Sequence, residues 1–235
     1  MMIEQHKSAE EKNVIKEKPV ISGVIFDLDG VIVDTAHYHY LAWKKLAQEL
    51  GINLTLEDNE KLKGISRMKS LDIILALGGV SLTDYEKEKL AKKKNTWFVD
   101  FIERMAPEEI FPGVKNLIGA LREKRLKIAL ASSSKNAKTV LDLLHVRPLF
   151  DVIVDGNMVV NSKPDPEIFL LAASMLNLEP SACLVFEDAE AGVQAAIDAG
   201  MKCVGIGSED QLGKANLVIS QTGDFQLEQL EELNC

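Results

Sequence analysis

The feature that most constrains the fold of this chain is an alternation of short apolar runs with amphipathic helical patterns. Six short runs of apolar and β-branched residues occur at 20–26, 127–132, 150–154, 182–187, 202–207 and 216–220. Segments with helical periodicity lie between most of them, at 113–124, 136–145, 166–178 and 191–200. Short apolar runs without polar alternation are typical of strands that are buried on both faces. The pattern therefore predicts an α/β fold with a doubly wound, mostly parallel, Rossmann-like sheet.

The segment between the first and second apolar runs breaks this alternation. Residues 36–107 show one helical pattern after another, including 37–51, 66–79 and 83–105, with no strand pattern between them. The α/β pattern resumes near Pro112 and Gly113, which provide a turn and a helix start. We therefore expect an α/β core domain formed by residues 19–34 and 108–235, and an inserted all-helical cap domain at residues 35–107. The polar and charged residues 1–18 are expected to form a disordered tail.

The composition restricts the classes of partner. The 235 residues are 46% hydrophobic and 27% charged, as in an ordinary globular protein, and the formal net charge is −9. An acidic balance argues against non-specific binding to nucleic acid or to an anionic membrane. The three cysteines, Cys183, Cys203 and Cys235, form no CxxC pair, which argues against structural zinc and a disulfide framework. No apolar run is long enough for a membrane span. We expect a cytoplasmic protein that acts as a monomer.

Carboxylates follow two of the predicted strands directly. Ligands of an open parallel sheet bind beyond the carboxyl ends of the strands. Asp27 and Asp29 follow the first apolar run, and Glu187 and Asp188 stand at the end of the run 182–187. Four carboxylates at one edge of a sheet repel one another unless a hard cation lies among them. Mg²⁺ prefers carboxylate oxygens, waters and substrate phosphate, so the sequence predicts a magnesium site at this edge.

Other strand ends carry groups that suit a phosphoryl group. The segment SSSKN (132–136) follows the second apolar run, and the segment SKP (162–164) comes after the third run and a loop. Hydroxyl groups, backbone N–H groups at a helix start and a lysine together bind phosphate. One aspartate of the pair could then attack phosphorus and form an aspartyl-phosphate, while the other gives and takes a proton. Each motif alone also fits a turn, a helix N-cap or an acidic helix start, but their order along the strands favours the catalytic interpretation.

Four segments in this order resemble the haloacid dehalogenase-like superfamily: FDLDG (26–30), LASSS (130–134), SKPDP (162–166) and FEDAEAG (186–192). The resemblance implies that Asp27 is the nucleophile and Asp29 the general acid/base. It implies that Ser132 and Lys163 hold the transferring phosphoryl group. It further implies that Mg²⁺ is bound by Asp27, the backbone of Asp29, Glu187 and Asp188. The helical insertion is similar to the small cap of this superfamily.

Two stretches of the expected cap carry residues that can meet a substrate. The stretch LKGISRMKSL (62–71) places Ser66 at a helix N-cap and Arg67 in the first turn, where a cation opposes the helix dipole by about 0.3–1 kcal/mol. A bound anion removes this penalty, so Arg67 is a candidate ligand of a second phosphate. The alternative is that the Arg67 side chain only extends along the surface of its helix into solvent. His39 and Trp43 are four residues apart and share a helix face that we expect to look toward the site, with a structural histidine as the alternative.

Core and cap motifs together are similar to those of the β-phosphoglucomutase family over residues 20–230. The resemblance implies a sugar-phosphate substrate: β-D-glucose 1-phosphate and β-D-glucose 6-phosphate would interconvert through an aspartyl-phosphate enzyme, with β-glucose 1,6-bisphosphate as primer. The implied substrate-binding residues are Thr35, His39, Trp43, Gly64, Ile65, Ser66, Arg67, Ser70, Lys94, Ser134, Lys135 and Asn136. The sequence departs from the family pattern at Val33, Asp165 and Ala189, which bears on cap closure and sugar preference. A sugar-phosphate phosphatase on the same fold is the nearest alternative, and a non-catalytic phospho-acceptor is another.

Overall fold

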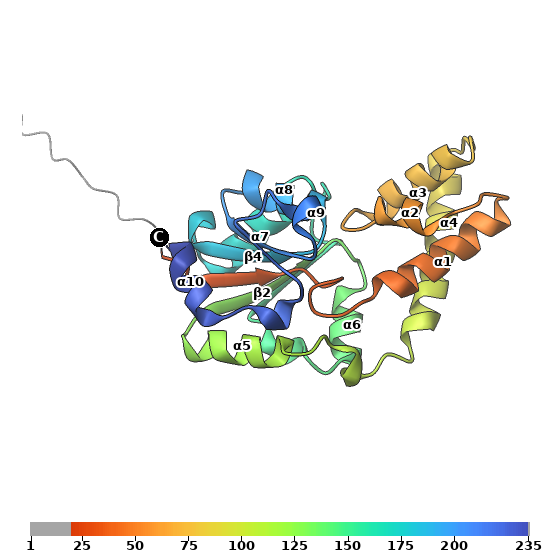
Figure 1. Ribbon diagram of the computed structural model, residues 1–235. Helices are drawn as coiled ribbons and strands as arrows, with labels where there is room; N and C mark the ends of the chain where they lie inside the picture. Colours follow the sequence, from red (N-terminus) through yellow and green to blue (C-terminus); the bar gives the residue numbers. More distant parts are fainter. Residues whose placement is uncertain (1–19, 235) are drawn as a thin grey trace, which may run out of the picture.

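A parallel six-stranded sheet forms the centre of the molecule in a computed structural model, which describes residues 20–234 (Figure 1). The strands are β1 (Gly23–Phe26), β2 (Lys127–Ser132), β3 (Val152–Asp155), β4 (Cys183–Glu187), β5 (Lys202–Ile206) and β6 (Leu217–Ile219). Their order is β3-β2-β1-β4-β5-β6, and every neighbouring pair is parallel. Each of the six predicted runs overlaps one of these strands, which confirms the predicted sheet. The order reverses between β1 and β4, and such a switch point is where open sheets bind ligands.

Helices cover both faces of the sheet, because every strand presents apolar side chains on both sides. One face is covered by α5 (Val114–Glu123), α6 (Ala137–Leu143) and α10 (Leu227–Asn234), and the other by α7 (Glu167–Leu176), α8 (Glu190–Asp198) and α9 (Glu209–Leu212) (Figure 1). On the first face, the ring of Phe26 stacks on Phe186 at 4.8 Å, and Phe186 packs edge-on against Phe225. Each buried aromatic side chain of this kind contributes roughly 1.5–3 kcal/mol. The short helices α9 and α10 were not predicted from the sequence.

Residues 35–107 contain helices and no strand in the described structure. These helices are α1 (Ala36–Glu49), α2 (Leu56–Glu60), α3 (Arg67–Leu77) and α4 (Asp84–Ile102), and they lie at one end of the sheet (Figure 1). Helices α1, α3 and α4 share a separate apolar cluster that includes Trp43, Leu46 and Leu71. As predicted, Ser66 caps α3, since its side chain accepts a hydrogen bond from the Lys69 amide. We refer to residues 35–107 as the cap; its exact division from the core stays a prediction, and the tail predicted for residues 1–18 lies outside the described residues.

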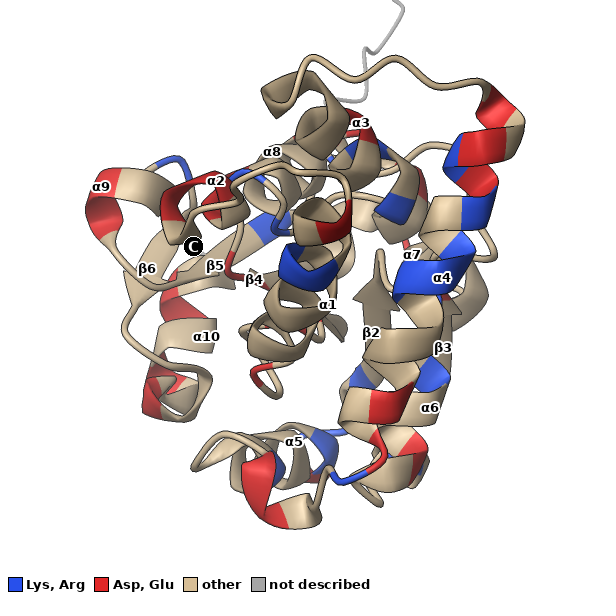
Figure 2. Ribbon diagram, turned by 90° about the vertical axis from the view of Figure 1, so that its right-hand side faces the viewer, with Lys and Arg blue, Asp and Glu red and all other residues tan. Residues whose placement is uncertain are grey.

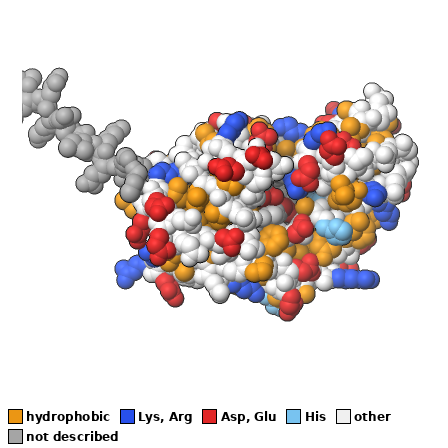
Figure 3. Space-filling model, viewed as in Figure 1, with side chains coloured by type: hydrophobic (Ala, Val, Ile, Leu, Met, Phe, Trp, Pro, Cys, Tyr) orange, Lys and Arg blue, Asp and Glu red, His pale blue; other side chains and the backbone are white. Residues whose placement is uncertain are grey.

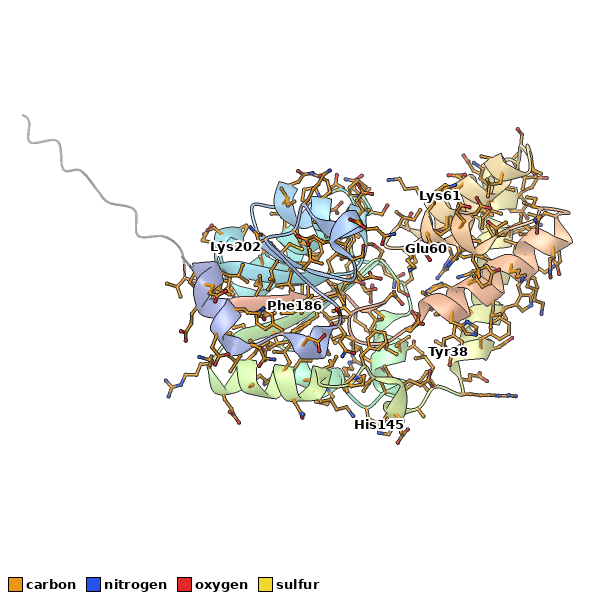
Figure 4. The ribbon with its side chains drawn as sticks, in the orientation of Figure 1. Tyr38, Glu60, Lys61, His145, Phe186 and Lys202 are labelled. Carbon is orange, nitrogen blue, oxygen red and sulfur yellow. The ribbon has the colours of Figure 1, made fainter. Side chains whose placement is uncertain are left out.

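Four short 3-10 helices complete the described structure: Pro107–Glu109, Arg147–Leu149, Pro180–Ala182 and Thr222–Asp224. The two connections between core and cap are tied to each other beside β1. The Phe111 amide donates to the Ile32 carbonyl at 2.9 Å, and Tyr38, labelled in Figure 4, donates from its hydroxyl to Glu109 at 2.8 Å. The buried Thr222 hydroxyl donates to the Val31 carbonyl at 2.7 Å. These contacts hold the turn that follows β1 at the base of the cap.

Charged groups are distributed unevenly between the two parts. Lysines gather on α4 in the cap, as Figure 2 shows, whereas acidic side chains are spread over the face seen in Figure 3. Most of these lysines are exposed, but Lys94 is only 1% exposed. Cys183 and Cys203 are buried in β4 and β5, as expected for small apolar side chains. No helix among the described residues is long and apolar enough to cross a membrane.

Candidate active site

The site begins at the carboxyl end of β1, where the chain makes a tight turn. Asp27 is 3% exposed, and its amide donates to the Phe186 carbonyl at 2.9 Å, which fixes the strand end against β4. Gly30 has a φ of +81°, and a Cβ atom there would lie 2.0 Å from Oδ2 of Asp188. Only glycine combines this backbone conformation with so close an approach. The turn therefore brings the carboxylates of two strands together.

Lys163 is the cation at the centre of the core site. Its side chain is fully buried, and its Nζ donates to Asp27 Oδ1 at 2.6 Å and to Glu187 Oε2 at 2.7 Å. Burial alone would lower the pKa of Lys163, but the two carboxylates outweigh it and raise that pKa above the usual value. The ammonium group therefore remains charged, and it holds Asp27 and Glu187 in place.

Carboxylate oxygens of Asp27, Glu187 and Asp188 lie within 4.8 Å of one another. Burial, partly offset by Lys163, raises the pKa of Glu187 to about 7; burial and then Glu187 raise the pKa of Asp188. A Cβ atom at Gly192 would lie 2.0 Å from Cδ of Glu187, so the glycine makes room for this carboxylate. Two buried carboxylates and the partly exposed Asp188, with one lysine beside them, form a donor set that fits a hard divalent cation.

Asp29 lies in the same turn as Asp27 but has a different environment. Its Oδ1 atom is buried and has no hydrogen-bond partner among the described residues. Burial and then the neighbouring Asp27 raise the pKa of Asp29 to about 8, although Lys163 and Lys94 act in the opposite direction. A carboxyl group with a pKa near neutrality is suited to exchange a proton with a substrate.

The loop after β2 faces the carboxylates. Ser132 is fully buried, and its hydroxyl accepts a hydrogen bond from the Ser134 amide at 3.1 Å. Ser133, Ser134 and Lys135 line a cavity between core and cap. This loop therefore supplies hydroxyl groups and a lysine on the side of the cavity that the core forms.

The cap contributes a buried pair of basic side chains. Lys94 Nζ lies 2.6 Å from Nδ1 of His39 and 4.6 Å from the ring centroid of Trp43. Burial and then Arg67 lower the pKa of Lys94 well below its usual value, while Asp29 acts in the opposite direction. Burial and then Lys94 lower the pKa of His39. His39, Trp43 and Lys94 all line the cavity, so the helix face that carries the first two does look toward the site.

The cavity brings together most of the residues predicted from the sequence. Those that line it are Asp27, Asp29, His39, Trp43, Gly64, Ile65, Arg67, Ser70, Lys94, Ser134, Lys135 and Asp188. Six predicted residues are near it without forming its wall: Thr35, Ser66, Ser132, Asn136, Lys163 and Glu187. Among these, Glu187 belongs to the carboxylate cluster, Lys163 pairs with Glu187 and Asp27, and Thr35 is the buried N-cap residue of α1. The roles assigned to these side chains stay predictions.

Direct contacts hold the cap against the core at the cavity. The Ser133 hydroxyl donates to the Gly64 carbonyl at 2.9 Å, and the Asn136 amide group donates to Oδ1 of Asn95 on α4 at 2.8 Å. A Cβ atom at Gly64 would lie 2.9 Å from the methyl group of Ala189. Asn136 thus contacts the cap, and its predicted contact with a phosphate stays a prediction.

Five residues of the cavity wall were not predicted: Ala36, Asn59, Leu62, Lys63 and Ser133. Lys63 and Ser133 lie inside the stretches LKGISRMKSL and ASSSKN, so their neighbours were a usable signal. Asn59 gave none, since it lies in the short helix α2, which no sequence pattern indicated.

Comparisons with known proteins agree with this geometry. Residues 21–200 match the family model described as haloacid dehalogenase-like hydrolase. The chain is 46% identical over 214 residues to the β-phosphoglucomutase of Bacillus subtilis. This match covers 90% of this chain and 95% of that protein. It is 34% identical over 186 residues to the phosphorylated carbohydrates phosphatase of Thermotoga maritima, with 77% and 83% covered. The crystal structure of β-phosphoglucomutase from Clostridium difficile superposes with a TM-score of 0.89 at 45% identity, over 92% of this chain and 97% of that one.

Proposed function

The chain belongs to the haloacid dehalogenase-like hydrolase family, and on this basis we propose that it is a β-phosphoglucomutase. The enzyme interconverts β-D-glucose 1-phosphate and β-D-glucose 6-phosphate through an aspartyl-phosphate on Asp27, with β-glucose 1,6-bisphosphate as primer. The match to the β-phosphoglucomutase of Bacillus subtilis supports this activity, because it extends over 90% of the chain and so includes both core and cap.

One observation carries the proposal: a single cavity is lined both by the core carboxylates and by cationic groups of the cap. Asp27 and Asp29 form part of its wall, Arg67 of the cap forms another part, and Lys135 of the core adds a further cation. A bisphosphate needs one place where a phosphoryl group reacts and a second where the other phosphate is held. Arginine binds phosphate bidentately, so Arg67 is suited to the second place. All these residues come from one chain, which supports a monomer as the working unit.

The proposed reaction uses Asp27 as nucleophile in both directions. Its carboxylate oxygen attacks a phosphorus atom of the bisphosphate, the bond from phosphorus to the sugar oxygen breaks, and Asp29 gives its proton to that oxygen. Asp29 then removes the proton from the 6-hydroxyl of β-glucose 1-phosphate, and this hydroxyl attacks phospho-Asp27. The attack restores the Asp27 carboxylate and forms a new bisphosphate, which reverses its orientation and returns the phosphoryl group from its 1-position to Asp27.

Mg²⁺ is the cation that we propose for the carboxylate cluster, held by Asp27, Glu187, Asp188 and the backbone of Asp29. When bound, it supplies positive charge that stabilises the charge developing on the transferring phosphoryl group. Lys163 and Ser132 hold the phosphoryl oxygens from the other side.

The cap is proposed to decide which acceptor receives the phosphoryl group. Phospho-Asp27 can react with water as well as with a sugar hydroxyl, so a mutase must exclude water until the sugar is bound. The contacts of Ser133 with Gly64 and of Asn136 with Asn95 connect cap and core beside the cavity, which supports such a role. A phosphatase would use the same catalytic groups and release the phosphate instead, as the name of the Thermotoga maritima relative indicates for that protein.

A coupled assay tests the proposal. The purified protein is incubated with β-glucose 1-phosphate, Mg²⁺ and a trace of β-glucose 1,6-bisphosphate, and both glucose 6-phosphate and inorganic phosphate are measured. Glucose 6-phosphate must form faster than inorganic phosphate, and only slowly when the primer is omitted. Stoichiometric release of inorganic phosphate would instead identify a sugar-phosphate phosphatase.

A further inference from the structure

Asn59 is a buried polar residue of the cavity wall that the proposed mechanism does not use. It lies near the end of α2, it is 8% exposed, and it lines the cavity beside Leu62 and Lys63. Its side-chain amide makes no hydrogen bond to any residue between 20 and 234. Neither amide atom is among the fully buried unpartnered side-chain atoms of the described residues, so the amide of this cavity-wall residue is open to a partner from outside the chain.

The neighbouring polar residues show that α2 does not need the Asn59 side chain. Asp58 accepts a hydrogen bond from the Thr55 backbone amide at 3.3 Å and so completes the capping box at the helix start. Glu60 pairs with Lys63 at 2.8 Å. Figure 4 shows Glu60 and Lys61 on the side of the cap that faces the core. Asn59 therefore stands at the junction, between two residues whose own side chains are already paired.

The chemistry of the group indicates which part of the substrate it meets. Phosphate oxygens only accept hydrogen bonds, and the cavity offers them the cationic side chains of Lys63, Arg67 and Lys135. A carboxamide is neutral and both donates and accepts, which matches a hydroxyl group. We propose that Asn59 is a specificity-determining residue that hydrogen-bonds a ring hydroxyl of the sugar. The inference rests on the proposed function only in taking a sugar phosphate as the substrate.

The test compares Asn59→Leu with the matched control Asn53→Leu. Asn53 is exposed, lies in the same part of the cap and is outside the cavity wall. The kcat/KM for β-glucose 1-phosphate should fall roughly ten-fold or more in Asn59→Leu, because one hydrogen bond to the sugar is lost. The kcat/KM for hydrolysis of p-nitrophenyl phosphate, which has no sugar hydroxyl, should stay within about two-fold of wild type. Asn53→Leu should change neither value.

Two further readouts separate recognition from a structural role. The midpoint of thermal unfolding should not fall in Asn59→Leu, since the substitution removes no hydrogen bond between described residues and leucine is similar in size to asparagine. Among 2-, 3- and 4-deoxyglucose 1-phosphates, one analogue should be turned over equally by wild type and variant, which identifies the hydroxyl that Asn59 contacts. If the leucine variant fails to fold, Asn59→Ala is measured in the same way.

Equal losses on sugar and sugar-free substrates, or no loss on either, would overturn the inference. A wild-type protein that releases phosphate from glucose 1-phosphate and forms no glucose 6-phosphate would overturn the mutase proposal alone. In that case a reduced preference of Asn59→Leu for sugar phosphates over p-nitrophenyl phosphate would still support the role of Asn59.

Discussion

Replacement of Lys163 by methionine tests the electrostatic core of the site. Lys163 is fully buried and lies 2.6 Å from Asp27 and 2.7 Å from Glu187. Methionine fills a similar volume but leaves two buried carboxylates without their counter-charge. Removal of one partner from a buried ion pair costs about 3–5 kcal/mol, because the remaining charge is left unpaired. For a chain of this length, each kcal/mol lowers the unfolding midpoint by about 2–4 °C, so we expect a decrease of about 10 °C.

The assay is chemical and thermal unfolding in a metal-chelating buffer, with Lys202→Met as the control. Lys202 begins β5 at the end of the sheet away from the cap, as Figure 4 shows, and it is half-buried. The control should unfold within about 1 kcal/mol of wild type. Phosphoryl transfer should also be lost in Lys163→Met, since Asp27 is no longer held in position. A loss of stability below about 1 kcal/mol in Lys163→Met would refute the description of Lys163 as the charge that compensates Asp27 and Glu187.

Three further predictions concern the nucleophile, the cap contacts and the cation. Asp27→Asn should abolish phosphoryl transfer, because the amide cannot attack phosphorus. The readout is the amount of glucose 6-phosphate formed, and turnover near the wild-type rate would contradict the mechanism. The double variant Ser133→Ala, Asn95→Ala should raise the ratio of inorganic phosphate to glucose 6-phosphate about ten-fold, since each removed hydrogen bond contributes about 0.5–1.5 kcal/mol to cap closure. Thr96→Ala, on the exposed face of α4, is the control. An unchanged ratio in the double variant would count against the closure argument. Without a cation, Glu187 holds its proton more tightly in the folded state, where its pKa is about 7, than at its ordinary pKa of 4.5. Its contribution to the free energy of unfolding therefore falls by about 3 kcal/mol as the pH rises from 4.5 to about 7. Millimolar Mg²⁺ should therefore raise the unfolding midpoint more at about pH 8 than at about pH 5, and equal shifts would be evidence against binding at this cluster.

The sheet could be predicted well because strands buried on both faces are continuous apolar runs. Each such run, for example 127–132, corresponds to a strand in the structure, and polar residues at the strand ends marked the core site. The helices α3 and α4 were also predicted, because they carry both periodicity and an N-cap residue. The helices α2, α9 and α10 were missed, since two of them are at most five residues long and the third is strongly acidic.

The cavity wall was predicted less completely, because it depends on how the cap packs against the core. Asn59 lines the cavity only through contacts between distant segments, and no local pattern carries that information. Asn136 is a second such case. The family resemblance implies that it contacts a phosphate, and this stays a prediction; its contact with Asn95 on the cap, 41 residues away, could not be predicted from the local sequence.

The fate of a labelled phosphoryl group tests the central claim most directly. Unlabelled β-glucose 1-phosphate is mixed with the protein, Mg²⁺ and β-glucose 1,6-bisphosphate labelled with ³²P, and the label is followed over the first turnovers. If Asp27 carries the phosphoryl group between sugars, the label must appear on the protein and in glucose 6-phosphate, and it must be absent from the protein in Asp27→Asn. Label that appears mainly in inorganic phosphate, or an Asp27→Asn protein that still becomes labelled, would contradict the account.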